Sequence, residues 1–181
     1  MHNARLSSVT GMIFTIRRNH GLEHATVHLL AEADRSRPLA GYSGPRGFYL
    51  IGRCTAEEIR AAAERAIQRM QAGEGWLAVH PGCGTNLATS SLLTSGLAGI
   101  GAALVGRKAR WTDRVGNALT FGMLGAVIAH PLGPWLQAHA TTSADMRGAR
   151  IADVRRAQPG GLNAPPRNAI VHFVETAFDR D

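Results

Sequence analysis

Residues 86–106 read NLATSSLLTSGLAGIGAALVG and contain no charged side chain. Residues 115–144 are also free of Asp, Glu, Lys and Arg, and Ala118–Ala138 is their apolar part. About 20 apolar residues are enough for a helix to cross the hydrocarbon core of a bilayer. The two runs therefore predict a transmembrane helical hairpin over residues 86–138, in an integral protein of the cell membrane with two spans. The alternative is a pair of buried helices in a soluble protein, since Gly, Ser and Thr make both runs only moderately apolar.

Small residues recur at every fourth position in both runs. The first run carries Ser91, Ser95, Gly99 and Ala103, and the second carries Ala118, Gly122 and Ala126 with His130 in line. In lipid, such ridges allow two helix backbones to approach closely. We expect the helices to pack against each other, or against copies of the chain or other membrane subunits. Pro131 and Pro134 are expected to distort or end the second helix near its exit.

The charge pattern leaves the orientation open. Basic residues lie between the two runs, where Arg107, Lys108, Arg110 and Arg114 occur, but also before the first run and after the second. The positive-inside rule therefore does not choose a side. Two spans do place both chain ends on the same side of the membrane.

The composition limits the remaining classes of protein. The chain has 181 residues and a net charge of +7, which allows one domain or two small units. Lys108 is the only lysine and the arginines are scattered, so a nucleic-acid-binding arm is not expected. Cys54 and Cys83 cannot build a disulfide framework. The first residues lack the pattern of a secretory signal peptide, and none is expected.

The polar segments predict a small α+β head. A helix is expected over residues 11–33, with Thr10 as its cap. The turn-rich segment Pro38–Gly47 followed by Phe48–Ile51 predicts a β-hairpin. Thr55 and Glu58 form a capping box for a helix over Ala56–Gln71, whose apolar face carries Ile59, Ala63, Ala66, Ile67 and Met70.

Three further strands complete this expectation. Trp76–Val79 is predicted to be a short strand, and the alternation in Arg150–Arg156 and Ala169–Thr176 predicts two more. The predicted organisation is an α+β head over residues 1–85, the transmembrane hairpin over 86–138, and a C-terminal segment over 139–181 whose two strands join the head.

The sequence His20-Gly-Leu-Glu23-His24 is an H-x-x-E-H pattern, the inverted zinc-protease motif. On a helix, residues four apart lie on one face, so the two imidazoles can share one metal ion. Glu23 lies beside them and is the candidate general base for a metal-bound water. His28 extends the same face by one turn and is a further candidate ligand. The alternative is a set of hydrogen-bonded core side chains.

The sequence His80-Pro-Gly-Cys83-Gly-Thr-Asn86 is the second signal. His80 and Cys83 lie three residues apart on a loop and can reach one metal ion. The alternative is a helix entry in which Thr85 or Asn86 is the cap and Cys83 packs as a small apolar residue. Together the two segments supply enough nitrogen and sulfur donors for one four-coordinate Zn²⁺.

A protease of the inverted type also needs a third ligand, usually a glutamate further along the chain. None of Glu57, Glu58, Glu64 and Glu74 is convincing, so Cys83 or His80 is the preferred third donor. His130 lies within an apolar run, where an ionisable residue suggests a function. Cys54, next to the capping Thr55, is expected to pack in the core, and His139 and His172 have no partner visible in the sequence.

These segments resemble a family of uncharacterised bacterial membrane proteins, a group defined by a domain of unknown function. The resemblance lies in three motifs, at Arg18–Thr26, Pro38–Leu50 and His80–Asn86, and covers roughly residues 15–135. It implies that the two histidine motifs occur together, but it implies no reaction.

The sequence thus predicts a membrane protein with a zinc site whose candidate ligands are His20, His24, His28, His80 and Cys83, and it leaves open which of His28, His80 and Cys83 complete the site. The site is expected to be non-catalytic, or to belong to a subunit of a membrane assembly. The alternative is a membrane-bound metallohydrolase or peptidase with Glu23 as its base. The lipid bilayer is the expected partner, and a nucleic acid is not.

Overall fold

The structure is a computed structural model that describes residues 2–106, 108–157 and 170–179, with side chains described from residue 9 onward. Arg107 of the basic segment and Ala169 of the last predicted strand lie outside these residues. The chain divides into two compact units. The α+β unit comprises Met1–His80 and Ala140–Asp181, and the helical unit comprises Pro81–His139.

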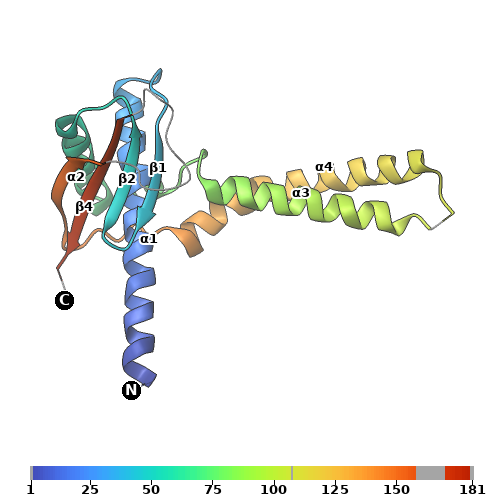
Figure 1. The fold of residues 1–181 in the computed structure, drawn as a ribbon, viewed down its shortest axis with the longest axis horizontal. Helices are drawn as coiled ribbons and strands as arrows, with labels where there is room; N and C mark the ends of the chain where they lie inside the picture. The colour runs from blue at the N-terminus through green and yellow to red at the C-terminus, as the bar shows by residue number, and fades with distance from the viewer. Residues whose placement is uncertain (1, 107, 158–169, 180–181) are drawn as a thin grey trace. The chain divides into compact units, whose positions relative to one another are not determined.

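The α+β unit is built on a four-stranded antiparallel sheet with the strand order β1-β2-β4-β3. Its strands are β1 (Ala40–Gly44), β2 (Gly47–Gly52), β3 (Ala149–Arg156) and β4 (Ile170–Phe178). β4 lies between β2 and β3, so the C-terminal segment supplies one of the two inner strands and one edge strand (Figure 1). The predicted α+β class is confirmed, and the predicted hairpin and the two C-terminal strands are present.

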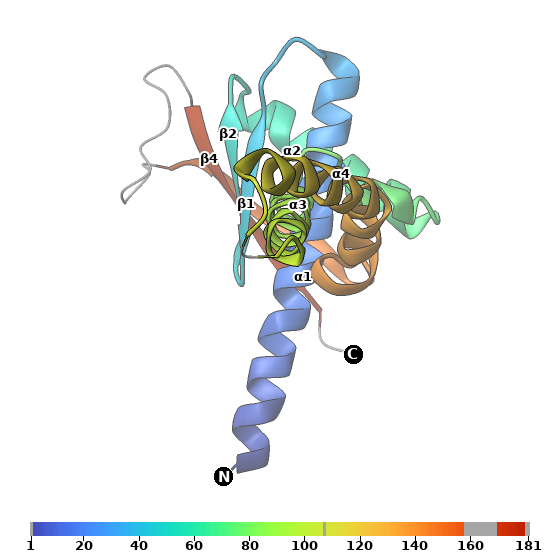
Figure 2. The ribbon, with the colours of Figure 1, turned by 90° about the vertical axis from the view of Figure 1, so that its right-hand side faces the viewer.

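Two helices cover one side of this sheet, as Figure 2 shows close to edge-on. They are α1 (His2–Ala33) and α2 (Ala56–Gln71). The core between them and the sheet contains fully buried side chains from every layer: Leu22, Phe48, Leu50, Ile59, Leu77 and Val174. Each such aliphatic or aromatic side chain contributes about 1.5–3 kcal/mol by leaving water.

The helix α2 has the predicted bounds because two residues close together in the sequence, Thr55 and Glu58, form its N-terminal cap. The Thr55 hydroxyl accepts a hydrogen bond from the Glu58 amide at 3.2 Å, and the Glu58 carboxylate accepts one from the Thr55 amide at 2.8 Å. The predicted apolar face, Ile59 to Met70, is buried.

Two local predictions were wrong. The first helix begins at His2, because the residues before Thr10 contain no helix-breaking proline and a single glycine such as Gly11 weakens a helix without ending it. Residues Gly75–Ala78 form a 3₁₀-helix, η1, where a strand was expected at Trp76–Val79. There the Val79 amide donates to the Trp76 carbonyl at 3.0 Å, which turns the chain before it can extend.

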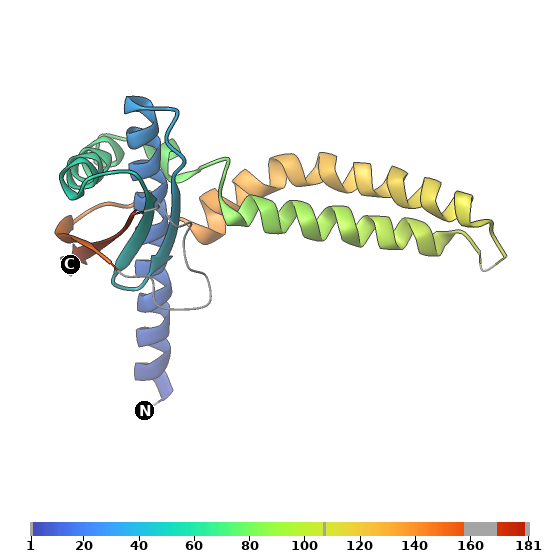
Figure 3. The same ribbon diagram turned by 45° about the horizontal axis from the view of Figure 1, so that its top comes forward.

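The helical unit consists of α3 (Gly84–Leu104) and α4 (Trp111–Leu136), which run antiparallel and side by side (Figures 1 and 3). Glycines make the contact close. A Cβ atom added at Gly125 would lie 2.5 Å from the Leu93 carbonyl oxygen, and one added at Gly101 would lie 2.6 Å from the Asn117 carbonyl oxygen. Two long apolar helices were predicted here, and they are present.

The contact surface differs from the predicted ridges. On α4, Gly122 is buried as expected, but Ala126 and His130 are exposed and the ridge continues through Gly125, Ala129 and Gly133. The predicted ridge of α3, with Ser91, Ser95, Gly99 and Ala103, is exposed along its whole length. Glycine allows a closer approach than alanine or histidine, which explains why the Gly125 face was selected.

The end of α4 also differs in detail. Pro131 and Pro134 lie inside α4, which continues to Leu136. The helix becomes irregular only after the two prolines, where residues Gln137–Thr141 form a wider π-helical turn, η2. The buried Gln137 side chain donates a hydrogen bond to the Asn86 side-chain oxygen at 2.7 Å and ties this end of α4 to the start of α3.

Candidate metal centre

Three histidines follow one face of α1 at intervals of four residues: His20, His24 and His28. The rings of His20 and His24 lie 4.4 Å apart, centroid to centroid. His24 is buried, while His20 and His28 are partly buried. The predicted helical spacing therefore places the first two imidazoles side by side.

Each of these rings is held by a backbone carbonyl. His20 Nδ1 lies 3.0 Å from the Thr141 oxygen, and His24 Nδ1 lies 2.7 Å from the Ala78 oxygen. His28 uses its other nitrogen, since Nε2 lies 2.9 Å from the Val79 oxygen. A carbonyl only accepts hydrogen bonds, so the nitrogen facing it carries the proton.

This hydrogen-bonding fixes the tautomers. In the neutral rings, the lone pair lies on Nε2 of His20 and His24 and on Nδ1 of His28. Histidines that bind metals commonly donate their other N–H to a carbonyl in this way, which orients the ring and raises its basicity. The hydrogen bonds of the α1 histidines are therefore compatible with metal binding.

His80 joins the same cluster from the loop after η1. Its ring lies 4.7 Å from that of His28 and 5.7 Å from that of His24. Burial, and then the neighbouring His28 and His24, lower the pKa of His80 to about 4. The ring is consequently neutral at pH 7, the form that binds a metal.

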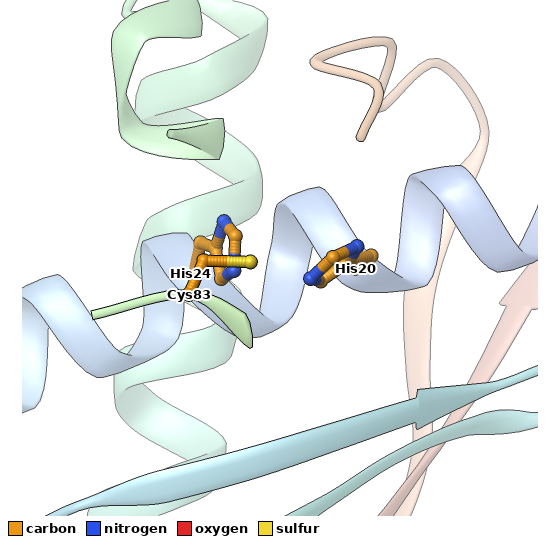
Figure 4. Close-up of side chains that lie close together, drawn as sticks. All are labelled: His20, His24 and Cys83. Atoms are coloured by element: carbon orange, nitrogen blue, oxygen red, sulfur yellow. The ribbon is translucent and has the colours of Figure 1, made fainter. Parts of the chain in front are cut away.

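Cys83 supplies a sulfur atom near two of the rings. Ligand atoms of His20, His24 and Cys83 all lie within 4.8 Å of one another (Figure 4). In a tetrahedral zinc site, bond lengths of 2.0–2.3 Å place neighbouring ligand atoms about 3.4–3.8 Å apart. The group is therefore compatible with one ion after a contraction of about 1 Å.

Cys83 is also the N-cap of α3, and the predicted caps Thr85 and Asn86 are not. The Cys83 sulfur accepts a hydrogen bond from the Thr85 amide at 3.4 Å. Sulfur takes this position because the chain turns at Pro81 and Gly82, and helical geometry begins already at Gly84. A donor at a helix N-terminus favours negative charge on sulfur, which is the state that binds metals.

Glu23, the predicted base, lies against the sheet. Its carboxylate accepts a hydrogen bond from the Ser43 hydroxyl of β1 at 2.5 Å, and the side chain is buried. Gly41, also on β1, leaves room for it, because a Cβ there would lie 2.1 Å from Glu23 Oε1.

The glutamates weighed as a third ligand lie elsewhere. Glu58 caps α2 and pairs with Arg37, Glu64 lies 3.8 Å from Arg60, and Glu74 pairs with Arg69. Within the described parts of the chain, the group of potential ligands contains two histidines and a cysteine but no carboxylate.

The remaining candidates are separate from this group. His130 is exposed on α4, and His139 stacks on Trp135 at 4.8 Å. His172 is buried in the sheet, and Cys54 lies 3.9 Å from Arg37 Nη1. Sequence reasoning missed the three carbonyls that orient the rings, because backbone acceptors leave no motif.

Comparison with known proteins places the chain in a family. A model described as a domain of unknown function, DUF6391, matches residues 15–154. The chain belongs to this family. It is also 38% identical over 151 residues to an uncharacterised protein of Picosynechococcus sp. (strain PCC 7002), covering 77% of this chain and 73% of that protein. No solved structure matches the chain significantly. The predicted membership of an uncharacterised family is confirmed.

Proposed function

We propose that this DUF6391 protein is an integral membrane protein with α3 and α4 as its two spans. Gly84–Leu104 and Trp111–Thr141 are long and apolar enough to cross a bilayer, with mean hydropathies of 1.4 and 1.3. Only 11% and 17% of their most apolar windows are buried within the structure. The core helices of a soluble protein would be mostly covered by protein, so lipid is the environment that fits this exposure.

We further propose that the histidine cluster binds one zinc ion. The observation that carries this proposal is that backbone carbonyls hold the His20 and His24 rings while ligand atoms of both residues lie within 4.8 Å of each other and of the Cys83 sulfur. Two imidazoles and a thiolate form a typical zinc ligand set. His80 is proposed as the fourth ligand, since its ring lies next to that of His24 and is neutral. His28 would then support His80 from the next turn of α1.

The role that we propose for the metal is structural. With His80 bound, four protein ligands close the coordination sphere, as in structural zinc sites. Glu23 would act by holding α1 on β1 through Ser43. The ion would thus fasten α1 to the loop that leads into α3, in a protein that acts as a membrane subunit.

A metallohydrolase is the second candidate, because the three-ligand group of His20, His24 and Cys83 is the observation that favours it. Three protein ligands leave one position for water, as in catalytic zinc sites. Glu23 would then have to leave Ser43 and take the proton of that water. The number of protein ligands separates the two candidates.

Metal analysis of the full chain, purified in detergent, tests the proposal. We expect about one zinc per chain in the wild type and less than about a tenth of that in His24→Ala and Cys83→Ala, because each removes a ligand. His139→Ala is the matched control and should retain the metal, since its ring stacks on Trp135. Wild-type protein without stoichiometric metal, or equal metal in all variants, would refute the site.

A further inference from the structure

Residues 9–14 of α1 carry an apolar surface that the α+β unit does not cover. Val9, Met12, Ile13 and Phe14 are between 43% and 52% exposed. The packed part of the helix starts directly afterwards. Arg17 donates to the Thr142 carbonyl at 3.1 Å, and Arg18 donates to the Asp145 carbonyl at 2.6 Å. The exposed segment therefore extends from a firmly held point (Figure 1).

The exposed apolar residues extend too far around the helix for one protein partner. At 100° per residue, Met12, Ile13 and Phe14 alone span about 200° of the helix circumference. A helix that docks into a groove or against another helix buries a narrower stripe, typically somewhat over 100° wide. A surface this wide fits a continuous apolar medium better than a single neighbouring element.

The length and polarity of the segment fit partial insertion into lipid. Residues 6–16 are uncharged and lie between Arg5 and the pair Arg17–Arg18. As a helix, eleven residues are about 16 Å long, roughly half of the 30 Å hydrocarbon core. The Thr15 hydroxyl donates to the Gly11 carbonyl at 3.0 Å, so its hydrogen is satisfied without water.

We infer that residues 6–16 insert into the hydrocarbon of the bilayer as a third membrane contact that does not cross it. This inference rests on the proposed membrane location of the chain. Its occupant is the acyl-chain region of lipid, and a second copy of the chain is the alternative that the experiment must distinguish. The insertion would attach the metal-bearing helix α1 itself to the membrane.

Hydroxyl-radical footprinting of the full chain in lipid nanodiscs tests this insertion with native residues. The discs are used in large excess, so that each holds one chain. Oxidation rates are divided by those of the urea-unfolded chain. Met123, on α4, reports on the spans. Met146 is buried in the fold, and Tyr42 is 69% exposed on β1. Protection of Met146 reports that the chain is folded, and oxidation of Tyr42 reports that radicals reach exposed side chains.

We expect Met12 and Met123 to be protected about tenfold or more, like Met146, while Tyr42 reacts freely. A freely oxidised Met12 beside a protected Met123 would overturn the insertion and leave the spans intact. Free oxidation of both would overturn the membrane location as well. A parallel sample with several chains per disc tests for a second copy. Protection of Met12 in that sample but not at one chain per disc would assign the surface to a second copy and refute the lipid contact.

Ile13→Lys provides the second arm of the test. A charge at this position makes burial in lipid unfavourable, so oxidation of Met12 should rise at least about fivefold while Met123 stays protected. Tyr42→Lys is the matched control and should leave Met12 protected. Continued protection of Met146 shows that each variant is folded. Unchanged protection of Met12 in Ile13→Lys would contradict the insertion.

Discussion

At the scale of single residues, the contact between Glu23 and β1 explains why the H-x-x-E-H pattern need not indicate a protease. The Glu23 carboxylate accepts the Ser43 hydroxyl hydrogen and occupies the space that Gly41 leaves open. A general base must instead reach the water that it activates. The contact assigns Glu23 a part in folding that its place in the motif does not reveal.

Substitution of Glu23 by glutamine separates these roles. We expect Glu23→Gln to lower the thermal midpoint or the zinc content, because the buried carboxylate loses a charge-assisted hydrogen bond worth about 1.5–3 kcal/mol. Differential scanning fluorimetry and metal analysis measure both quantities. Glu64→Gln, an exposed position, is the control. A variant with normal stability and metal content that loses a hydrolytic activity of the wild type would favour the enzyme.

A second substitution tests the same contact from the other side. In Gly41→Ala the new methyl group would overlap the Glu23 carboxylate at 2.1 Å, so we expect a loss of about 1–3 kcal/mol in stability. Gly44→Ala on the same strand is the matched control, since the nearest atom to its Cβ is 3.9 Å away. Equal thermal midpoints in the two variants would show that the Glu23 contact contributes nothing.

The pH dependence of stability follows from His80. Burial and the neighbouring histidines lower the pKa of His80 from 6.5 to about 4. Between these values the unfolded chain takes up a proton that the folded chain excludes, so stability is present above pH 6.5 and falls as the pH drops towards 4. In metal-free protein, His80→Gln should weaken this decline, as measured by thermal unfolding from pH 7 to 4.

The stability of the His80→Gln variant should still fall as the pH drops, because His172 also contributes to the pH dependence. Burial and Arg156 lower the pKa of His172, so its loss of stability runs in the same direction as that of His80. The decline should therefore become shallower in His80→Gln without disappearing. Identical pH profiles for the wild type and the variant would contradict the neutral state of the partly buried His80.

At the scale of elements, the contact between α3 and α4 depends on glycines at particular positions. A Cβ at Gly125 would lie 2.5 Å from a backbone oxygen of α3, and backbone cannot move aside as a flexible side chain can. Gly125→Ala should therefore lower the thermal midpoint of the chain in detergent. Gly99→Ala is the control, since no atom lies within 4 Å of its Cβ. Equal effects would contradict the helix contact.

The same two helices show what the sequence can and cannot predict. The composition and length of the two runs predicted both helices, because an uncharged apolar run can be recognised from consecutive residues alone. The face that each helix turns to the other depends on how closely the two backbones approach. The sequence of α4 alone does not show whether Gly125 or Ala126 lies in the contact with α3. The capping box at Thr55 predicted α2 correctly because its hydrogen bonds are local. Trp76–Val79 was wrong because its apolar pattern suits both a strand and the buried turn.

The candidate metal centre was predictable to a similar extent. The spacing of His20 and His24 on a helix predicted neighbouring rings, and the structure places them together. The orientation of those rings depends on carbonyls more than fifty residues away, at Ala78 and Thr141. Such acceptors exist at every residue, so only the fold shows which of them meet an imidazole.

At the scale of the whole molecule, the α+β unit is formed by the two ends of the chain, and the helical unit lies between them in sequence. β4 pairs with both β2 and β3, so the sheet joins residues far apart along the chain. The proposed zinc ligands lie on α1 and on the segment that leads into α3. A metal at this place would link the fold of the α+β unit to the start of the first proposed span.

A measurement of the ligands of the proposed zinc ion tests this account most directly. X-ray absorption at the zinc edge, on the full chain in detergent, should show nitrogen neighbours at about 2.0–2.1 Å and one sulfur at about 2.3 Å. In Cys83→Ser the sulfur signal should disappear. A zinc ion without a sulfur neighbour in the wild type, or protein that binds no zinc, would contradict the proposed centre.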